Sequence, residues 1–444
     1  MASTAERRRD TPQQRGWYVY DWANSSFPTT VGTVFFGPYL IAVAEGSVDA
    51  AGRVSLLGIA VAPQQLFFIA LAISALLQVF ALPIVGAFAD RSSHKRRWLA
   101  GTAYTGAALT TAMFLVVPGA WQLGFALILF ANLAFSASIV VYDSFLPEIA
   151  DPDDRDRVSS RGWAFGYIGG GLLLALNLAL YLFDPLGDEG LTVRISLGSA
   201  GLWWALFTIV PLRRLEDGPA LHGGDVSGGV VAGAFRELRA TMRQLSEYPE
   251  TVKYLVAFLL FNGGVGTVIY AAGSYATEEL GIEIATLTAA ILMVQFVAFV
   301  GALVLGALAR RAGAKQVVLW SLALWSAVVV YGRFVPAGNV PVFFALAAAI
   351  GFVLGGTQAL SRSLYSHLVP PQREAEFFGF YQISDRGTSV LGQLGFVFAY
   401  GVAGSYRQAL LVLIFFFIAG GLMLLVTDFR KGIDAVGNPQ PAVL

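Results

Sequence analysis

Long apolar runs, separated by short polar connections, make up most of this chain. A hydrocarbon core about 30 Å thick requires about 20 apolar residues in each helix that crosses it. Runs of about that length lie at 17–43, 63–88, 98–117, 120–143, 162–183, 191–212, 252–277, 285–309, 315–334, 340–366, 376–401 and 406–427. They lack the alternation of apolar and polar residues that marks the strands of a membrane β-barrel. The pattern therefore predicts an all-α membrane protein with twelve transmembrane helices.

A polar stretch at 213–250 divides the runs into two sets of six. We therefore expect six-helix bundles at 17–212 and 252–427, with cytoplasmic tails at 1–16 and 428–444. Inside the polar stretch, apolar residues fall at helical spacing, offset from arginines: Phe235, Leu238, Met242 and Leu245. This spacing predicts an amphipathic helix on the cytoplasmic membrane surface. A solvated linker helix without membrane contact fits it equally well.

The two halves share landmarks in the same order. The segment "GAFADRSSHKRR" from Gly86 is matched by "GALARRAGAK" from Gly306. Likewise, "FGYIGGG" from Phe165 is matched by "FGFYQIS" from Phe378. Duplicated six-helix halves with a binding site between them, near the bilayer midplane, are typical of secondary transporters. The repeat thus favours a transporter built from two pseudo-symmetric bundles.

Basic residues in the connections predict the orientation in the membrane. Nearly all of the Lys and Arg residues fall on one side of the predicted membrane. The other side holds only Arg53, Arg194, Arg333 and Arg407. Because cytoplasmic loops are enriched in Lys and Arg, both termini are predicted to be cytoplasmic. We expect a multi-pass protein of the plasma (inner) membrane.

Composition excludes several kinds of chemistry. Of the 444 residues, 56% are hydrophobic and 13% are charged, against about 25% charged in soluble domains. The absence of Cys excludes disulfides and thiol catalysis, and zero net charge predicts no nucleic-acid partner. No P-loop motif for ATP is present. We expect no enzyme, cofactor or metal site, because metal-ligand clusters are absent and the histidines all fall in predicted loops: His94, His222 and His367.

The first apolar run contains residues that a membrane helix usually avoids. The segment "YDWANSSFPTT" from Tyr20 places Asn24, Ser25 and Pro28 on one helical stripe. Pro28 cannot donate to the carbonyl of Asn24, which is costly in lipid but suits a wet cavity. We interpret these three residues as lining a substrate cavity. Close helix packing through small residues is the alternative.

The matching run of the second half contains a comparable segment. "FNGGVGT" holds Asn262, Gly263 and Gly264, and paired helix-breaking segments in two halves point to a carrier's binding site. We predict that these residues line the same cavity. Gln358 and Arg362, one turn apart on a later helix, are candidates for it as well. Arg362 fits a cytoplasmic-end anchor equally well.

Few ionisable residues fall inside the runs. A charged side chain at a helix centre costs about 2.5–3.5 kcal/mol on insertion scales, so such residues are candidates for function. Asp21, Asp143 and Asp385 are candidates for proton or ion coupling. Asp21 fits a gate, a helix cap or a proton site, and the sequence does not choose among them. The guanidinium of Arg386 matches a substrate carboxylate; an interhelical ion pair is the alternative.

Several of these segments resemble known transporters. "GAFADRSSHKRR" resembles the loop signature between the second and third helices of the major facilitator superfamily. "YDWANSSF", "FLPEIA", "SSRGWAFGYIGGG" and "GGTQALSRSLYSHLVPPQREAEFFGFY" resemble its vacuole-effluxer-like branch, the autophagy-related amino-acid effluxers. The resemblance runs from the first to the last predicted helix. It implies the major facilitator fold and a rocker-switch carrier, with amino acids as the implied substrates.

The resemblance also implies a gate. Residues of the loop signature would bridge the two halves on the cytoplasmic face and hold the outward-open state: Gly86, Asp90, Arg91, Arg96 and Arg97. The second copy of the signature departs from the first, because Arg310 stands where the first copy has Asp90. A second departure is Gln393, where the family pattern has a Pro that bends the helix.

Together these features predict a secondary active or facilitative transporter of a small organic solute, amino acids first, that works by alternating access. The expected partners are the substrate, the lipid bilayer and a coupling proton, and we expect a monomer. One alternative is an exporter of amphiphilic drugs or lipids, which a cavity dominated by Phe and Trp would favour. Another is a non-transporting membrane receptor, although no connection is long enough for a signalling domain.

Overall fold

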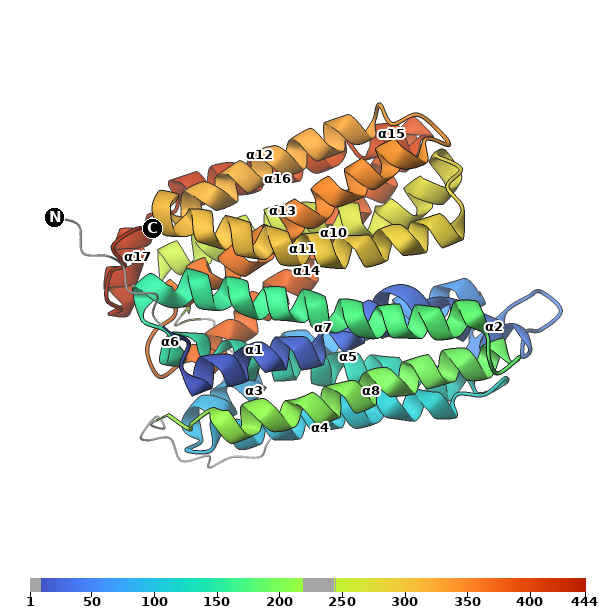
Figure 1. Cartoon of the computed structure of the whole chain (residues 1–444), viewed down its shortest axis with the longest axis horizontal. Coiled ribbons are helices and arrows are strands. Elements are labelled where there is room, and N and C mark those ends of the chain that lie inside the picture. Colours follow the sequence, from blue (N-terminus) through green and yellow to red (C-terminus); the bar gives the residue numbers. More distant parts are fainter. Residues whose placement is uncertain (1–8, 219–242, 244) are drawn as a thin grey trace.

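The computed structural model describes residues 9–218, 243 and 245–444, without the side chains of a few residues between 387 and 403. Its described residues are almost entirely helical (Figure 1). The amphipathic helix predicted around 235–245 lies largely outside the described residues.

Six membrane-spanning segments form the N-terminal half. The first is composite and consists of α1 (Pro12–Asn24), the π-helical η1 (Phe27–Phe35) and α2 (Phe36–Glu45). The other five are α3 (Pro63–Arg91), α4 (Lys95–Ala112), α5 (Trp121–Asp143), α7 (Arg155–Phe183) and α8 (Glu189–Arg214). Short elements in the connections are the antiparallel hairpin β1 (Val54–Leu56) and β2 (Ile59–Val61), η2 (Met113–Leu115), α6 (Leu146–Ile149) and η3 (Pro152–Asp154).

Six further segments form the C-terminal half. They are α10 (Pro249–Ser274) with η4 (Tyr275–Glu279), α11 (Ile284–Ala312), α12 (Ala314–Gly332), α13 (Val340–His367), α14 (Glu374–Ala403), and α15 (Tyr406–Ala409) with α16 (Val412–Val426). A short helix, α17 (Phe429–Val436), follows them. His367, which was predicted to lie in a loop, is the last residue of α13 and is buried. The helix extends one residue past the predicted run, and its end packs inside the protein.

Ten segments of the described chain are long and apolar enough to cross a membrane. Helices α4 and α14 complete the two sets of six. Both begin with charged residues, and α14 also carries Asp385 and Arg386 in its interior. The predicted all-α fold with twelve transmembrane helices in two bundles is therefore confirmed.

The two bundles lie side by side, with α7 next to α11 and α3 next to α14 (Figure 1). The start of α1 and the helix α17 lie at the same end of the molecule (Figure 1), which we call the terminal end; the opposite end is the far end. The chain enters the first helix through Thr11, whose hydroxyl accepts from the Gln14 amide at 3.1 Å. The Gln14 side chain accepts from the Thr11 amide in return, which is the capping box that fixes a helix start.

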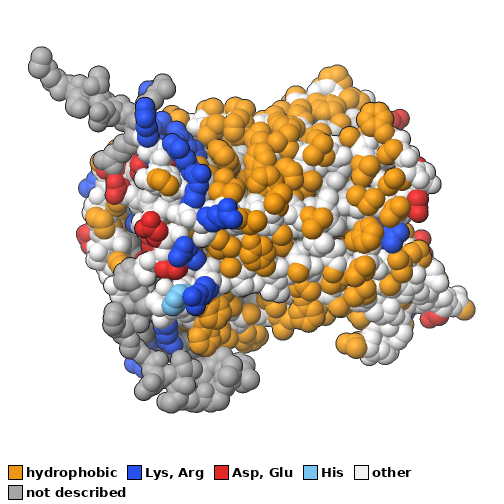
Figure 2. Space-filling model, turned by 60° about the horizontal axis from the view of Figure 1, so that its bottom comes forward, with side chains coloured by type: hydrophobic (Ala, Val, Ile, Leu, Met, Phe, Trp, Pro, Cys, Tyr) orange, Lys and Arg blue, Asp and Glu red, His pale blue; other side chains and the backbone are white. Residues whose placement is uncertain are grey.

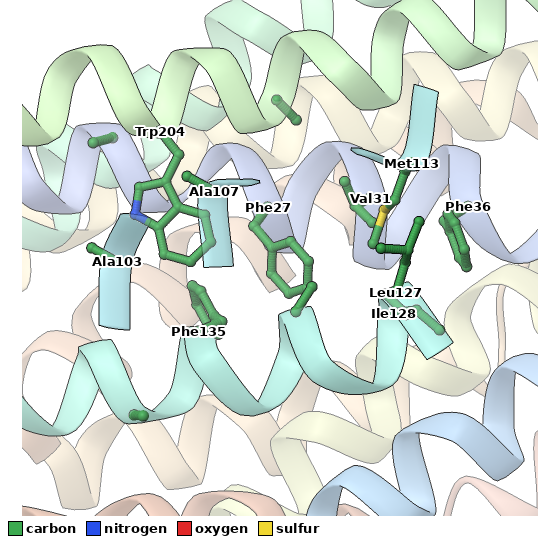
Figure 3. Packing of buried hydrophobic residues seen from close by; sticks show 14 of the residues in the cluster. Phe27, Val31, Phe36, Ala103, Ala107, Met113, Leu127, Ile128, Phe135 and Trp204 are labelled. Atoms are coloured by element: carbon green, nitrogen blue, oxygen red, sulfur yellow. The ribbon is translucent and has the colours of Figure 1, made fainter. Parts of the chain in front are cut away.

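Each half has its own apolar core. In the N-terminal half, Phe27, Phe135 and Trp204 converge from η1, α5 and α8 (Figure 3). Their ring centroids lie 5.1–6.0 Å apart, within the range of favourable aromatic pairs. A Cβ atom at Gly106 would lie 2.3 Å from the Trp204 ring, so this glycine lets α4 approach α8. The first helix is thereby held firmly against the core of its bundle.

Candidate functional site

Arg362 of α13 joins the two halves. Its guanidinium is buried and donates to Asp21 of α1 at 3.0 Å and to Asp143 of α5 at 3.1 Å. It also donates to the hydroxyl and carbonyl oxygens of Ser159 in α7, at 3.0 and 3.1 Å. One arginine of the C-terminal half thus binds three helices of the N-terminal half. The side chain is buried between the halves and is not exposed as a surface anchor would be.

Aromatic rings and a glycine surround this ion pair. The guanidinium carbon lies 4.5 Å from the ring centroid of Trp17, 5.4 Å from Trp163 and 5.6 Å from Tyr142. Such rings attract a cation that has lost its water. A Cβ atom at Gly162 would lie 2.6 Å from the Asp21 carboxylate and 3.0 Å from the guanidinium, so glycine provides the space. We call Asp21, Asp143, Ser159 and Arg362 the central ion-pair cluster.

The polar stripe predicted on the first helix has mixed surroundings. Asn24 is 4% exposed, and its side-chain nitrogen has no hydrogen-bond partner in the protein. Ser25 is half-buried and packs against Gly166 of α7. Pro28 is exposed and lies in η1, where its carbonyl accepts from the Thr33 hydroxyl at 2.8 Å. The helix therefore changes geometry at Pro28, the residue that lacks an amide hydrogen.

Polar residues of the C-terminal half form a chain across three helices. The side-chain nitrogen of Gln358 in α13 donates to Asn262 of α10 at 2.7 Å, and Asn262 donates to Asp385 of α14 at 2.7 Å. Arg386 follows on α14, with its Nε 3.8 Å from the Asp385 carboxylate. We call Asn262, Gln358, Asp385 and Arg386 the amide–arginine cluster. It brings together, from three helices, four residues that the sequence analysis singled out.

Arg386 is incompletely paired. Its guanidinium lies 5.8 Å from the ring centroid of Phe135 in the other half. The Arg386 Nε is buried without a hydrogen-bond partner among protein groups, whereas the whole side chain is 31% exposed. The exposed fraction therefore belongs to other atoms of this side chain.

The two glycines of "FNGGVGT" serve packing. A Cβ atom at Gly264 would lie 2.6 Å from the Phe417 ring of α16, and the Gly263 carbonyl lies 2.4 Å from the position of a Cβ at Gly392. Helix α10 continues through both without interruption, and Thr267 donates to the Gly263 carbonyl at 2.7 Å. The expected helix break is therefore absent from this half. Glycine stays helical here because neighbouring helices fill the space beside it.

A polar group that the sequence analysis missed lies on α3 and α5. Gln78 and Asn132 both donate to the hydroxyl of Ser74, each at 3.1 Å. All three are buried, and the Gln78 carbonyl oxygen has no partner in the protein. Ser74 and Gln78 stand one turn apart in an otherwise apolar run, and this i, i+4 spacing was the available signal.

At the terminal end, Asp90 of one half binds the first turn of a helix in the other half. Its two carboxylate oxygens accept from the backbone amides of Ala375 and Glu376, at 2.9 and 2.8 Å, in the first turn of α14. A Cβ atom at Gly86 would lie 2.3 Å from the Ala375 carbonyl, so only glycine allows this approach. A carboxylate at a helix N-terminus satisfies unpaired amides and the helix dipole. Asp90 therefore ties α3 of one half to α14 of the other.

The basic residues of the loop signature have separate roles. Lys95 lies 3.7 Å from Asp90 and donates to Glu148 at 2.6 Å. Arg96 pairs with Asp217 at 3.0 Å, on its own half. Arg91 and Arg97 are exposed. The cation beside the Asp90 carboxylate is thus Lys95, which belongs to the signature segment "GAFADRSSHKRR".

Further hydrogen bonds across the two halves lie toward the terminal end. Arg155 donates to the Ser366 carbonyl at 2.9 Å, and the Ser159 hydroxyl donates to the Ala359 carbonyl at 2.7 Å. Toward the far end, the described residues meet across the halves by packing, such as Phe68 on Tyr270 with ring centroids 5.9 Å apart. The two halves are thus joined by polar contacts at the terminal end.

Comparison with known proteins gives consistent results. A family model described as "Vacuole effluxer Atg22 like" matches residues 9–437. An uncharacterized MFS-type transporter, YxiO, from Bacillus subtilis (strain 168) is 30% identical over 96% of this chain and 97% of that protein. Autophagy-related protein 22-1 from Penicillium rubens is 26% identical over 82% of this chain and 75% of that protein.

Solved structures with a similar fold are transporters as well. The proton:xylose symporter XylE aligns with a TM-score of 0.71 at 11% identity, over 96% of this chain and 98% of that one. The transporter FucP in its outward conformation aligns with a TM-score of 0.67 at 11% identity, over 94% and 98%. At these identities the similarity concerns the fold alone.

The central ion-pair cluster generates a prediction about stability. Arg362→Ala leaves two buried carboxylates without their cation, so we expect a loss of about 3–5 kcal/mol, as for other broken buried pairs. Thermal unfolding of the purified protein in detergent measures it. The triple variant Asp21→Asn, Asp143→Asn, Arg362→Gln removes all three charges and is expected to recover most of the loss. An Arg362→Ala protein that melts like wild type would contradict the role of the pairs.

Proposed function

Since this chain belongs to the Atg22-like vacuole effluxer family, and is thus a major facilitator transporter, we propose that it carries α-amino acids by alternating access. One observation carries the proposal. The central ion-pair cluster and Asp90 join the two halves on the terminal side, while the partly exposed amide–arginine cluster retains unpaired donors. This arrangement supports a carrier whose site opens toward the far end.

The chemistry of the amide–arginine cluster suits an amino acid. The planar guanidinium of Arg386 binds a carboxylate with two parallel hydrogen bonds. The neighbouring carboxylate of Asp385 would bind the ammonium group of the amino acid. Asn262 and Gln358 supply side-chain amides nearby. An exporter of amphiphiles would instead need a cavity dominated by Phe and Trp. The polar character of this cluster favours the amino acid.

Charge at the terminal end supports a cytoplasmic position for both termini. Lys and Arg gather at one edge of the apolar belt, toward the terminal end (Figure 2). Lys and Arg are retained on the cytoplasmic side of membranes. We therefore propose that the protein lies in the plasma membrane with its terminal end facing the cytoplasm. The described state is then outward-facing. We propose that a single chain is sufficient for transport.

Opening the terminal end requires that Arg362 leave two carboxylates. Asp21 and Asp143 would then lose the cation they share, and water would reach them. Protonation of one carboxylate lowers the cost of that separation, because it removes one of the two charges. We therefore assign proton coupling to Asp21 and Asp143, and assign Asp385 to substrate binding.

The substrate prediction is tested with the full-length protein in detergent. A thermal-shift screen of the twenty standard amino acids, sugars and amphiphilic drugs is expected to show stabilisation by amino acids, because binding to the folded state raises its stability. Arg386→Ala should lower the affinity for the tightest-binding amino acid about 10- to 100-fold, because the substrate carboxylate loses a charged hydrogen-bonded partner. The control Arg311→Ala, at an exposed residue near the end of α11, should bind normally. Stabilisation by sugars or drugs alone would refute the proposal.

The gate makes a kinetic prediction. Asp90→Asn keeps the shape of the side chain but turns a donor toward one of the two backbone amides of α14. We expect kcat in proteoliposomes to fall about ten-fold, the effect of one lost buried hydrogen bond, with little change in KM. The control Glu283→Gln removes an exposed carboxylate and should transport like wild type. Equal losses in binding and turnover would exclude a gating role.

Coupling is measured by accumulation against a gradient. An inward pH gradient should drive labelled amino acid into wild-type proteoliposomes above its external concentration. Asp143→Asn should abolish this accumulation but retain exchange of labelled for unlabelled substrate, since exchange needs no net proton movement. If the pH gradient has no effect on wild-type uptake, the coupling assignment is wrong while the substrate assignment stands.

A further inference from the structure

A groove outside the transport pathway lies among α3, α4 and α5. Its volume is about 740 Å³, within the range of about 300–1,000 Å³ for small-molecule sites. Val85 of α3, Leu109 of α4, and Leu133 and Ala137 of α5 contribute to its lining. These α5 residues lie on a different stripe from Phe135, which faces Arg386. The groove is therefore separate from the amide–arginine cluster.

Small residues hollow out this groove. A Cβ atom at Gly101 of α4 would meet no atom within 4 Å. The Thr102 hydroxyl already donates to the Trp98 carbonyl at 2.8 Å, so it presents no unsatisfied donor to the groove. Trp98 itself stacks on Phe88 of α3, with ring centroids 5.9 Å apart. The lining is consequently almost wholly apolar, and a hydrocarbon chain fits it.

One end of the groove carries a positive charge. Arg97, the third residue of α4, belongs to the lining and is exposed. Its neighbour Arg96 is engaged with Asp217, and no acidic residue is among those that line the groove. From Arg97 to Leu109 the helix rises about 18 Å, at 1.5 Å per residue. The groove thus combines a cation at the terminal end with an apolar channel that extends into the membrane.

We propose that this groove binds an anionic phospholipid, with one acyl chain along α4 and the headgroup phosphate on Arg97. The charge selects the headgroup, because a basic residue near an anionic lipid surface contributes about 1 kcal/mol, roughly five-fold in affinity. The fit of the acyl chain to the apolar groove determines where the lipid binds. The site lies on the outer side of α3, the helix that also carries Asp90.

Native mass spectrometry of the full chain, extracted from vesicles of phosphatidylethanolamine and phosphatidylglycerol, tests the proposal. We expect wild type to retain phosphatidylglycerol in preference to phosphatidylethanolamine. Arg97→Gln should reduce this preference roughly five-fold. Gly101→Phe should remove one retained lipid of either kind, because its ring fills the groove. Matched controls are Arg311→Gln, at an exposed residue near the end of α11, and Gly273→Phe, at another helical glycine with open space beside it.

A second measurement needs no variant. Phosphatidylglycerol with a photoreactive diazirine in its acyl chain should crosslink wild type on α3, α4 and α5 at the groove. Crosslinks spread evenly over the membrane surface would overturn the proposal. So would equal retention of both lipids by wild type, or Gly101→Phe protein that retains as much phosphatidylglycerol as Gly273→Phe.

Discussion

A buried guanidinium between two carboxylates is the constraint on which the rest of the structure depends. Arg362 is 3% exposed, and removing its water is tolerable only if every donor finds an acceptor. Asp21, Asp143 and Ser159 provide those acceptors, and all three belong to the other half. The cluster is thus complete only while the halves are together at this level. The same contacts that stabilise the closed terminal end must be broken to open it.

Two interactions join the halves at the terminal end, and they differ in the charged group that is buried and in its depth. The central ion-pair cluster is an arginine in an aromatic cage, deep between the halves. The outer contact is a carboxylate on the first amides of α14, beside Lys95. Partial opening strands a buried charge at either contact, but the second lies nearer the terminal end, where water enters first. Opening is therefore expected to begin at Asp90 and finish at Arg362.

The sequence was sufficient to predict the twelve helices, because a bilayer imposes their length and leaves long apolar runs. The resemblance to a family signature implied that Asp90 contacts the other half, and its carboxylate does so at Ala375 and Glu376; its role as a gate stays a proposal. The partners of Arg362 could not be predicted, since Asp143 and Asp21 lie 219 and 341 residues away. The continuity of α10 could not be predicted either. The sequence shows the glycines but does not show that Phe417 packs beside Gly264. Long-range packing decided both.

The two intramembrane arginines, Arg362 and Arg386, differ in how completely they are hydrogen-bonded. Arg362 donates to two carboxylates and to both oxygens of Ser159. Arg386 has only a 3.8 Å approach to the neighbouring carboxylate and a ring beneath it. A buried guanidinium that already makes four hydrogen bonds has little left to offer a ligand, so we assign Arg362 to the gate. A partly exposed cation without a full set of acceptors remains costly until an anion binds it, so we assign Arg386 to substrate recognition. Binding of a carboxylate at Arg386, which also contacts Phe135 of the other half, would draw the two halves together on the substrate side of the gate.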